Sequence, residues 1–389
     1  DGSKVLALTF MHGARRRLDD RLARVPGIER RYECATLDSF AARLVRRWQS
    51  LTIREHYGEP HESEYEETCR AAAALLNHCH VVLWVKASYP ILIIDEAQDL
   101  SANRLDVVRR LATELTTLIA ADEFQCLDGG LRPNPAWSWL QTQEDHVKLE
   151  RTMRTNVDSL LNAAAALRSG LDLPIGPGFS VRATANAALA STFLNNQIAW
   201  KVQGKSLAVI SPVVKAFADE TVMKSAAKAT KQGNGPYRVD WEQAEEKVVE
   251  ALLARIVAPA VATPAEALEA VRATGDHILC NEFSSWVDRL IRTRCDVAIS
   301  REMLSATVKQ ICANRARFQR SSDLGYKAMS VHRAKNREFD YVVVLWPAAT
   351  SGDDDQKRRL LYNAVTRAKV ECLVLVQAKK HLDAPPFKR

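Results

Sequence analysis

A run of four apolar residues leads into two acidic ones in the stretch Ile91-Leu92-Ile93-Ile94-Asp95-Glu96-Ala97-Gln98-Asp99. A short continuous run rich in β-branched side chains is typical of a central strand in a parallel sheet. Similar apolar runs occur at residues 4–10, 115–120, 207–211, 341–345 and 371–376. Segments of helical pattern lie between these runs, so the sequence predicts an α/β fold with parallel sheets.

The acidic pair at the end of this predicted strand suits a cation. An apolar strand that ends in Asp-Glu is the Walker B pattern, and α/β sheets bind ligands at the carboxyl ends of their strands. Asp95 can hold magnesium there through water, and Glu96 can polarise a water that attacks a phosphate. The same residues also fit a strand that runs into a capped helix, because Asp99 and Ser101 are good helix caps.

A second predicted strand end has the same character, since Ile119-Ala120-Ala121 is followed by Asp122-Glu123-Phe124-Gln125. Two neighbouring strand ends that both carry acids are unfavourable unless they face a cation or solvent. Gln125 in such a place can orient an attacking water. Arg154 and Arg367 lie in two further segments and can stabilise charge on a transferring phosphoryl group, although either Arg alone also fits a solvated helix face.

Composition narrows the class of protein only slightly. The 389 residues include 54 Lys and Arg against 47 Asp and Glu, a net charge of +7 that weakly favours a polyanionic partner such as nucleic acid. The eight cysteines form no Cys-x-x-Cys pair, which argues against a zinc ribbon or a disulfide framework, and reduced thiols indicate a cytoplasmic protein. The sequence contains no run of 18 apolar residues and therefore predicts no membrane span.

Together these segments resemble the UvrD/Rep-like superfamily 1 DNA helicases. The resemblance runs through almost the whole chain in the family's order, at residues 5–14 (motif Ia), 35–40 (Ib), 95–99 (II), 122–125 (III), Arg154 (IV), 329–340 (V) and 359–369 (VI). It implies two RecA-like parallel-sheet domains of the P-loop NTPase type, with ATP and Mg²⁺ between them. Their expected bounds are residues 1–150 with a short helical insertion at about 49–89, and residues 151–389 with a helical insertion at about 215–325.

The resemblance also implies roles for individual residues. Asp95 and Glu96 would serve magnesium and the attacking water, Gln125 would sense the γ-phosphate, and Arg154 and Arg367 would be two arginine fingers. On the nucleotide side the expected contacts also include Asp122, Met153 in place of an adenine-stacking Tyr, and Glu338 on the ribose. The expected single-stranded DNA track consists of Thr9, Phe10, His12, Thr36, Ser39, Ser330 and His332.

Some features depart from the family pattern. The sequence holds no G-x-x-x-x-G-K-[ST] phosphate loop, which in the family precedes motif Ia, so we expect this segment upstream of Asp1; the alternative is a relic that binds ATP poorly. Motif III lacks its DNA-stacking aromatics, and core packing is the favoured role of the later Trp137 and Trp139. Asp38 replaces a His in motif Ib. Asn336 replaces a Gly in motif V, and the loop can survive because Asn tolerates the left-handed conformation better than most residues.

The sequence thus predicts a compact ATP-dependent helicase or translocase on single-stranded DNA. Movement from 3′ to 5′, a role in DNA repair or phage defence, and a partner such as a nuclease follow from the resemblance alone. Because the residues on the ATP side match the family pattern more closely than those on the DNA side, we expect DNA-stimulated ATPase activity more than vigorous unwinding. Two alternatives stay open: a nucleotide- or DNA-sensing regulatory subunit of a nuclease complex, and a degenerate scaffold without ATPase activity.

Overall fold

The computed structural model describes residues 2–10, 12–55, 57, 65–149, 152–242, 245–293, 298–318 and 325–388. The chain divides into two compact units. The first unit comprises Asp1–Glu55, Cys69–Glu242 and Asp323–Arg389, and it contains two parallel sheets. The second unit comprises His56–Thr68 and Gln243–Ser322.

The four-stranded sheet has the order β2-β1-β3-β4 and all its pairs are parallel. Its strands are β1 (Val5–Thr9), β2 (Tyr32–Thr36), β3 (Ile91–Asp95) and β4 (Thr116–Ile119). The apolar run of β3 is central, as its sequence predicted. Thr9 pairs in register with both Thr36 and Asp95, so the carboxyl ends of three strands bring three predicted site residues to one edge.

Helices connect and flank these strands. They are α1 (His12–Leu22), α2 (Leu37–Arg47), α3 (Gln49–Arg54), α4 (Tyr65–Leu75), α5 (Cys79–Ser88), α6 (Ala102–Ala112) and α7 (Pro135–Leu140). The helix α7 begins directly at Pro135. Asn134 caps this helix by accepting a hydrogen bond from Trp137 N at 2.9 Å, and Pro135 at its first turn loses no intrahelical hydrogen bond.

The six-stranded sheet has the order β5-β12-β11-β6-β10-β7, again fully parallel. Its strands are β5 (Phe179–Thr184), β6 (Leu207–Ser211), β7 (Val239–Trp241), β10 (Tyr326–Ser330), β11 (Phe339–Trp346) and β12 (Ala368–Gln377). Side chains along β11 alternate between two buried clusters: Val342 and Val344 face one, and Val343 and Leu345 face the other. Both faces are therefore covered, which explains the continuous apolar sequence of these strands.

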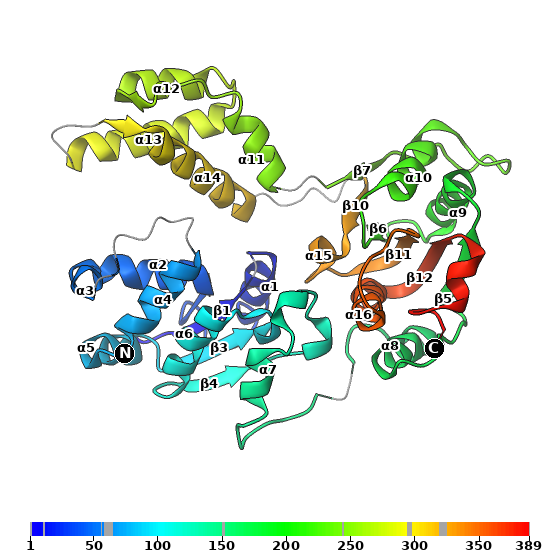
Figure 1. Cartoon of the computed structure of the whole chain (residues 1–389), viewed down its shortest axis with the longest axis horizontal. Helices are drawn as coiled ribbons and strands as arrows, with labels where there is room; N and C mark the ends of the chain where they lie inside the picture. Colours follow the sequence, from blue (N-terminus) through cyan, green and yellow to red (C-terminus); the bar gives the residue numbers. More distant parts are fainter. Residues whose placement is uncertain are drawn as a thin grey trace. The chain divides into compact units, whose positions relative to one another are not determined.

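Two pairs of helices provide that cover, as Figure 1 shows. They are α8 (Asp158–Ser169) with α16 (Asp354–Val365) on one face, and α9 (Ala187–Trp200) with α10 (Ala216–Ala227) on the other. The short α15 (Val331–Ala334) follows β10. These two parallel sheets and their helices confirm the predicted α/β fold of RecA-like domains. None of the helices in the described residues is long and apolar enough to cross a membrane.

The second unit has its own small core. Its elements are α11 (Glu245–Leu253), β8 (Val261–Ala262), α12 (Pro264–Arg272), α13 (His277–Thr293), β9 (Ile299–Ser300) and α14 (Arg301–Phe318). Phe283, Val287 and Val308 are fully buried in its centre. The helical insertion was expected to begin at about residue 215, but α10 and β7 belong to the first unit because β7 pairs with β10 of the six-stranded sheet.

The buried side chains of β11 allow a test of core packing. We expect Leu345→Ala to lower the free energy of unfolding by about 2–5 kcal/mol, because the side chain is fully buried and its removal leaves a cavity. Leu118→Ala in β4 is the control, since Leu118 is 64% exposed and should change stability by less than about 0.5 kcal/mol. Urea unfolding followed by circular dichroism measures both changes. Equal losses of unfolding free energy in the two variants would contradict the burial of Leu345.

Candidate functional site

The acidic end of β3 turns sharply. Glu96 has a left-handed backbone conformation with φ of 62°, and its N–H donates to Asp95 Oδ1 at 3.1 Å. A non-glycine residue in this conformation is strained, and such strain is common at functional sites. Burial and the neighbouring Glu96 carboxylate both raise the pKa of Asp95. A bound cation would remove that penalty, because it favours the charged carboxylate.

A chain of hydrogen bonds links this turn to the end of the neighbouring strand and to motif VI. Gln98 Nε2 donates to Glu96 Oε2 at 2.5 Å, and Asp122 N donates to Gln98 Oε1 at 2.9 Å. Gln125 Nε2 then donates to Asp122 Oδ2 at 2.8 Å, and Arg367 Nη2 donates to Gln125 Oε1 at 3.3 Å. We call these five residues the polar chain; it brings four predicted site residues together through Gln98, which sequence reasoning did not assign.

Arg367 is a buried cation, with only 1% of its surface exposed. Its guanidinium donates to neutral acceptors: Asn363 O at 3.0 Å, the Gln125 side-chain oxygen, and Thr366 Oγ1 at 3.4 Å. Burial, and secondarily the Arg154 guanidinium, lower the pKa of Arg367 to about 10, so it stays charged at neutral pH. A buried guanidinium with neutral acceptors is well suited to an anionic ligand.

The predicted finger Arg154 lies beside the predicted ribose contact Glu338. Arg154 Nε is 3.1 Å from Glu338 Oε1, and Arg154 Nη1 donates to Thr366 O at 2.5 Å. Arg17 at 3.1 Å and Lys369 at 3.2 Å also pair with Glu338. Burial raises the pKa of Glu338, but these cations, Arg154 first, outweigh it and hold the pKa below its usual value.

Met153, expected to cover an adenine, is 80% exposed. Its side chain is therefore accessible, while the adjacent Arg154 is held by protein groups. The structure does not bring Met153 into the polar chain. Its role on a base stays a prediction.

Two predicted DNA-track residues lie at the end of β1. Thr9 is buried, and its Oγ1 finds no hydrogen-bond partner among the described residues. Phe10 is half-buried, with the Arg104 guanidinium 5.1 Å from its ring centre. Arg104 also explains the Asp38 replacement in motif Ib, because its Nε and Nη2 donate to the two Asp38 oxygens at 2.8 and 3.3 Å. The carboxylate that would repel a phosphate is thus neutralised within the protein.

Of the other predicted track residues, Thr36, Ser39 and Ser330 take local structural roles. Thr36 Oγ1 caps α2 by accepting from Ser39 N at 3.2 Å, and it donates to Ser39 Oγ at 2.7 Å. Ser330 caps α15 by accepting from Arg333 N at 3.4 Å. His332 is exposed on that helix. The His12 side chain lies outside the described part of the structure.

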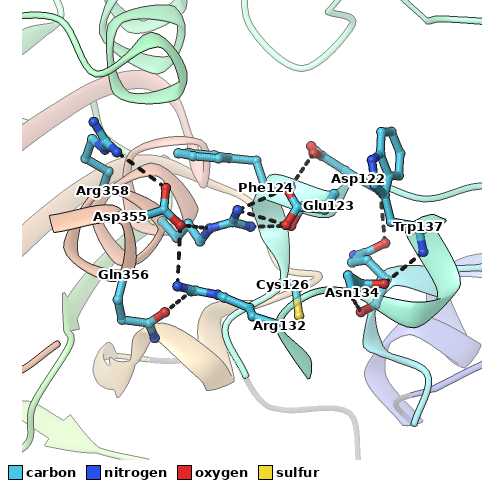
Figure 2. Close-up of polar contacts among 12 residues, drawn as sticks. Asp122, Glu123, Phe124, Cys126, Arg132, Asn134, Trp137, Asp355, Gln356 and Arg358 are labelled. Atoms are coloured by element: carbon cyan, nitrogen blue, oxygen red, sulfur yellow. Dashed lines mark hydrogen bonds and ion pairs between the residues drawn. The ribbon is translucent and has the colours of Figure 1, made fainter. Parts of the chain in front are cut away.

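Figure 2 shows the polar contacts that Glu123 and Arg132 make with residues of α16. Arg359 of α16 donates to both Glu123 oxygens at 2.8 and 3.0 Å and to Asp355 at 2.6 Å. Arg132, which follows the 3₁₀ turn Gly129–Leu131, is 3.4 Å from Asp355 and donates to Gln356. The segment from Glu123 to Arg132 is therefore tied to α16 by charged contacts. Trp137, expected in the core, is 37% exposed.

A second charged contact joins motif V to motif II. Lys335 Nζ pairs with Asp99 Oδ2, and the two side chains are only 6% and 12% exposed. Burial raises the pKa of Asp99, and the Lys335 ammonium acts in the opposite direction. Asn336, which replaces a Gly of the family pattern, follows with φ of 65°. It therefore adopts the left-handed conformation, which Asn tolerates better than most residues.

A relaxed form of the phosphate-loop pattern occurs at Ala199, Gly204, Lys205 and Ser206. A phosphate loop joins the end of a strand to the start of a helix. This segment does the reverse, because it follows α9 and leads into β6. Lys205 Nζ is 3.2 Å from Asp340 Oδ1, and Ser206 Oγ donates to Asp340 Oδ2 at 2.8 Å, so both bind the protein itself.

The acidic end of β3 offers carboxylates that could hold a metal ion. Among the described residues no group of three or more His, Cys, Asp or Glu is placed to hold a metal ion. Mg²⁺ is commonly bound by one or two carboxylates together with substrate phosphates. Asp95 and Glu96 at the strand end fit that pattern, and they do not form an all-protein cage.

The Lys335–Asp99 pair allows a test of the contact between motifs II and V. We expect Lys335→Met to lower the free energy of unfolding by about 3–5 kcal/mol at pH 8, because it leaves a buried carboxylate unpaired. The raised pKa of Asp99 means that the folded variant takes up a proton more readily than the unfolded chain, so the loss should shrink as the pH falls towards 5. Adding Asp99→Asn should recover much of the loss in a denaturant titration; an additive double variant would contradict the pair.

Comparison with known proteins adds one family match. The model of the UvrD-like helicase C-terminal domain matches residues 326–375, which include β10, α15, β11, α16 and most of β12. This part of the chain carries Glu338, Arg359 and Arg367. A search of curated proteins found no match. The family match supports a relation to the UvrD-like helicase superfamily and suggests a helicase-type function.

Proposed function

We propose that the protein is an ATP-driven motor acting on single-stranded DNA. The observation that carries the proposal is the buried Arg367, whose neutral acceptors connect it through Gln125 to the acidic end of β3. Cationic and acidic groups on one hydrogen-bonded chain suit a phosphate–magnesium ligand, which needs both. The UvrD-like match over residues 326–375 agrees with this assignment.

The nucleotide side of the proposal gives each group one role. Asp95 would hold Mg²⁺, which would neutralise the phosphate oxygens when bound. Glu96 would accept a proton from the attacking water, and Gln125 would orient that water. Arg367 and Arg154 would stabilise the charge that develops on the transferring phosphoryl group. The ion pair of Arg154 with Glu338 would have to loosen for its guanidinium to reach the phosphate.

The proposal requires a phosphate loop that the sequence itself does not contain. Backbone N–H groups, a Lys and a Ser or Thr of such a loop hold the phosphates and magnesium in P-loop ATPases. The segment at Gly204–Ser206 does not supply them, because it lies at the amino end of β6. Experiments on ATP should therefore use the full-length protein.

A regulatory module is the second candidate, and the motif III contacts favour it. Arg132 and Glu123 are engaged with α16, and the same segment offers Gly129 and Gly130 where aromatic stacking on bases would be expected. A module that binds nucleotide and DNA without separating the strands would not need these base-stacking aromatics. Strong ATP hydrolysis without strand displacement, measured on a partly duplex DNA, would favour this candidate.

The ATPase proposal has a direct test. We expect Glu96→Gln to lower kcat by about 10²–10⁴-fold, because it removes the proton acceptor, and Arg367→Ala to lower it by about 10³-fold or more. Steady-state ATP hydrolysis by full-length protein, with and without single-stranded DNA, measures both. Glu114→Gln is the matched control, since Glu114 pairs with Lys86 at the far end of α6 and should leave the rate unchanged. Equal low rates in wild type and both site variants would rule out the motor.

The DNA proposal is tested separately through Phe10. We expect Phe10→Ala to weaken binding of a labelled oligothymidine by about 1–3 kcal/mol, the contribution of one base stacked on an aromatic ring. Phe193→Ala serves as control, because the Phe193 ring on α9 is likewise covered by an arginine, Arg182, at 5.5 Å. Fluorescence anisotropy gives both affinities. Unchanged binding by the Phe10 variant would remove this residue from the DNA track.

A further inference from the structure

Arg168, near the end of α8, is held on three sides. Its Nη2 and Nε donate to the Tyr362 hydroxyl at 2.6 and 3.1 Å. The guanidinium lies 4.6 Å from the centre of the Tyr362 ring and 5.4 Å from that of Phe124. It also forms an ion pair with Asp122 Oδ2. An arginine with 41% of its side chain exposed is thus fixed in one orientation by a hydroxyl, two rings and a carboxylate.

The Asp122 carboxylate connects Arg168 to the polar chain. Its Oδ1 accepts from Phe124 N at 3.2 Å, and its Oδ2 accepts from Gln125 Nε2 at 2.8 Å. Arg168 donates to that same Oδ2. The place of this one oxygen therefore decides both where Arg168 points and where the Gln125 amide points.

The Gln125 amide has its other end on Arg367. Its Oε1 accepts from Arg367 Nη2, so both ends of the amide are occupied. A glutamine side chain has several rotatable bonds, and fixing it costs conformational entropy that these contacts must offset. If the Asp122 carboxylate rotated away, Gln125 would lose one of its two anchors.

We propose that Arg168 is a positioning residue, which fixes the Asp122 carboxylate and through it the amide of Gln125 at the nucleotide site. Arg168 lies outside the segments that resemble the helicase motifs, and in the described structure its guanidinium hydrogen-bonds Asp122 and Tyr362 only. It acts on the reaction through Asp122 and does not touch the acidic end of β3. This inference rests on the proposed ATPase function, which it extends by one residue on α8.

The test is a double-mutant cycle on ATP hydrolysis by the full-length protein. We expect Arg168→Gln to lower kcat by about 10–100-fold, the usual effect of losing a residue that orients a reacting group, with little change in KM for ATP. The same change made in a Gln125→Ala background should have no further effect, because its route to the reaction is already gone. Arg168→Lys should recover only part of kcat, since an ammonium keeps the charge but lacks the planar fork.

Controls separate positioning from folding and from the wider proposal. Arg182→Gln removes another arginine that covers an aromatic ring, and it should leave kcat and KM unchanged. Thermal unfolding should show similar midpoints for the wild type and Arg168→Gln. If hydrolysis depends on Glu96 but Arg168→Gln retains wild-type kcat, or loses the same factor in both backgrounds, this inference is wrong and the ATPase stands. Hydrolysis that does not depend on Glu96 overturns both.

Discussion

Burying the Arg367 guanidinium costs several kcal/mol, because it removes a charge from water. The hydrogen bonds that Arg367 donates to Asn363 O, Thr366 Oγ1 and Gln125 Oε1 offset part of that cost, but all three acceptors are neutral. The lowered pKa of about 10 reports the remaining imbalance, and it is still too high for the charge to be lost. Such a cation is held in place by the fold without an anionic hydrogen-bond partner among the described residues, which is the preorganisation that a phosphoryl-transfer site would use. The polar chain extends this constraint to Glu96, so the two sheet edges depend on each other.

Packing gives that dependence its rigidity. Phe124 follows β4 of the four-stranded sheet, yet it lies in the buried cluster that α8 and α16 form on the six-stranded sheet. The centre of its ring is 5.1 Å from that of Tyr362, with the two rings edge to face, and the Arg359 guanidinium is 4.9 Å from the centre of the Phe124 ring. Because Gln125 is the next residue, its backbone cannot shift without disturbing this cluster. Interiors transmit such strain because they are close-packed.

The sequence could predict the strands and the strand ends but not the contacts between distant segments. Continuous apolar runs such as Ile91–Ile94 identify buried parallel strands, and acids after them mark the edge where ligands bind. Nothing periodic in the sequence reveals that Lys335 pairs with Asp99 across 236 positions, or that Arg104 pairs with Asp38. Those pairs follow from tertiary packing. The strand β7 is only three residues long, which is too short to show an alternation, and so the start of the helical insertion was expected too early.

The contacts on the two sides of residues 122–125 differ in charge. On one side Arg367, which is 1% exposed, has only neutral acceptors among the hydrogen bonds of the described residues, and one of them is Gln125 Oε1 at 3.3 Å. On the other side Glu123 and Asp355 share Arg359, whose side chain is only 8% exposed. Because removing one partner of a buried ion pair leaves an uncompensated charge, this contact holds the segment firmly against α16. The charge of Arg359 is therefore satisfied within the protein, whereas the charge of Arg367 has no anionic hydrogen-bond partner among the described residues.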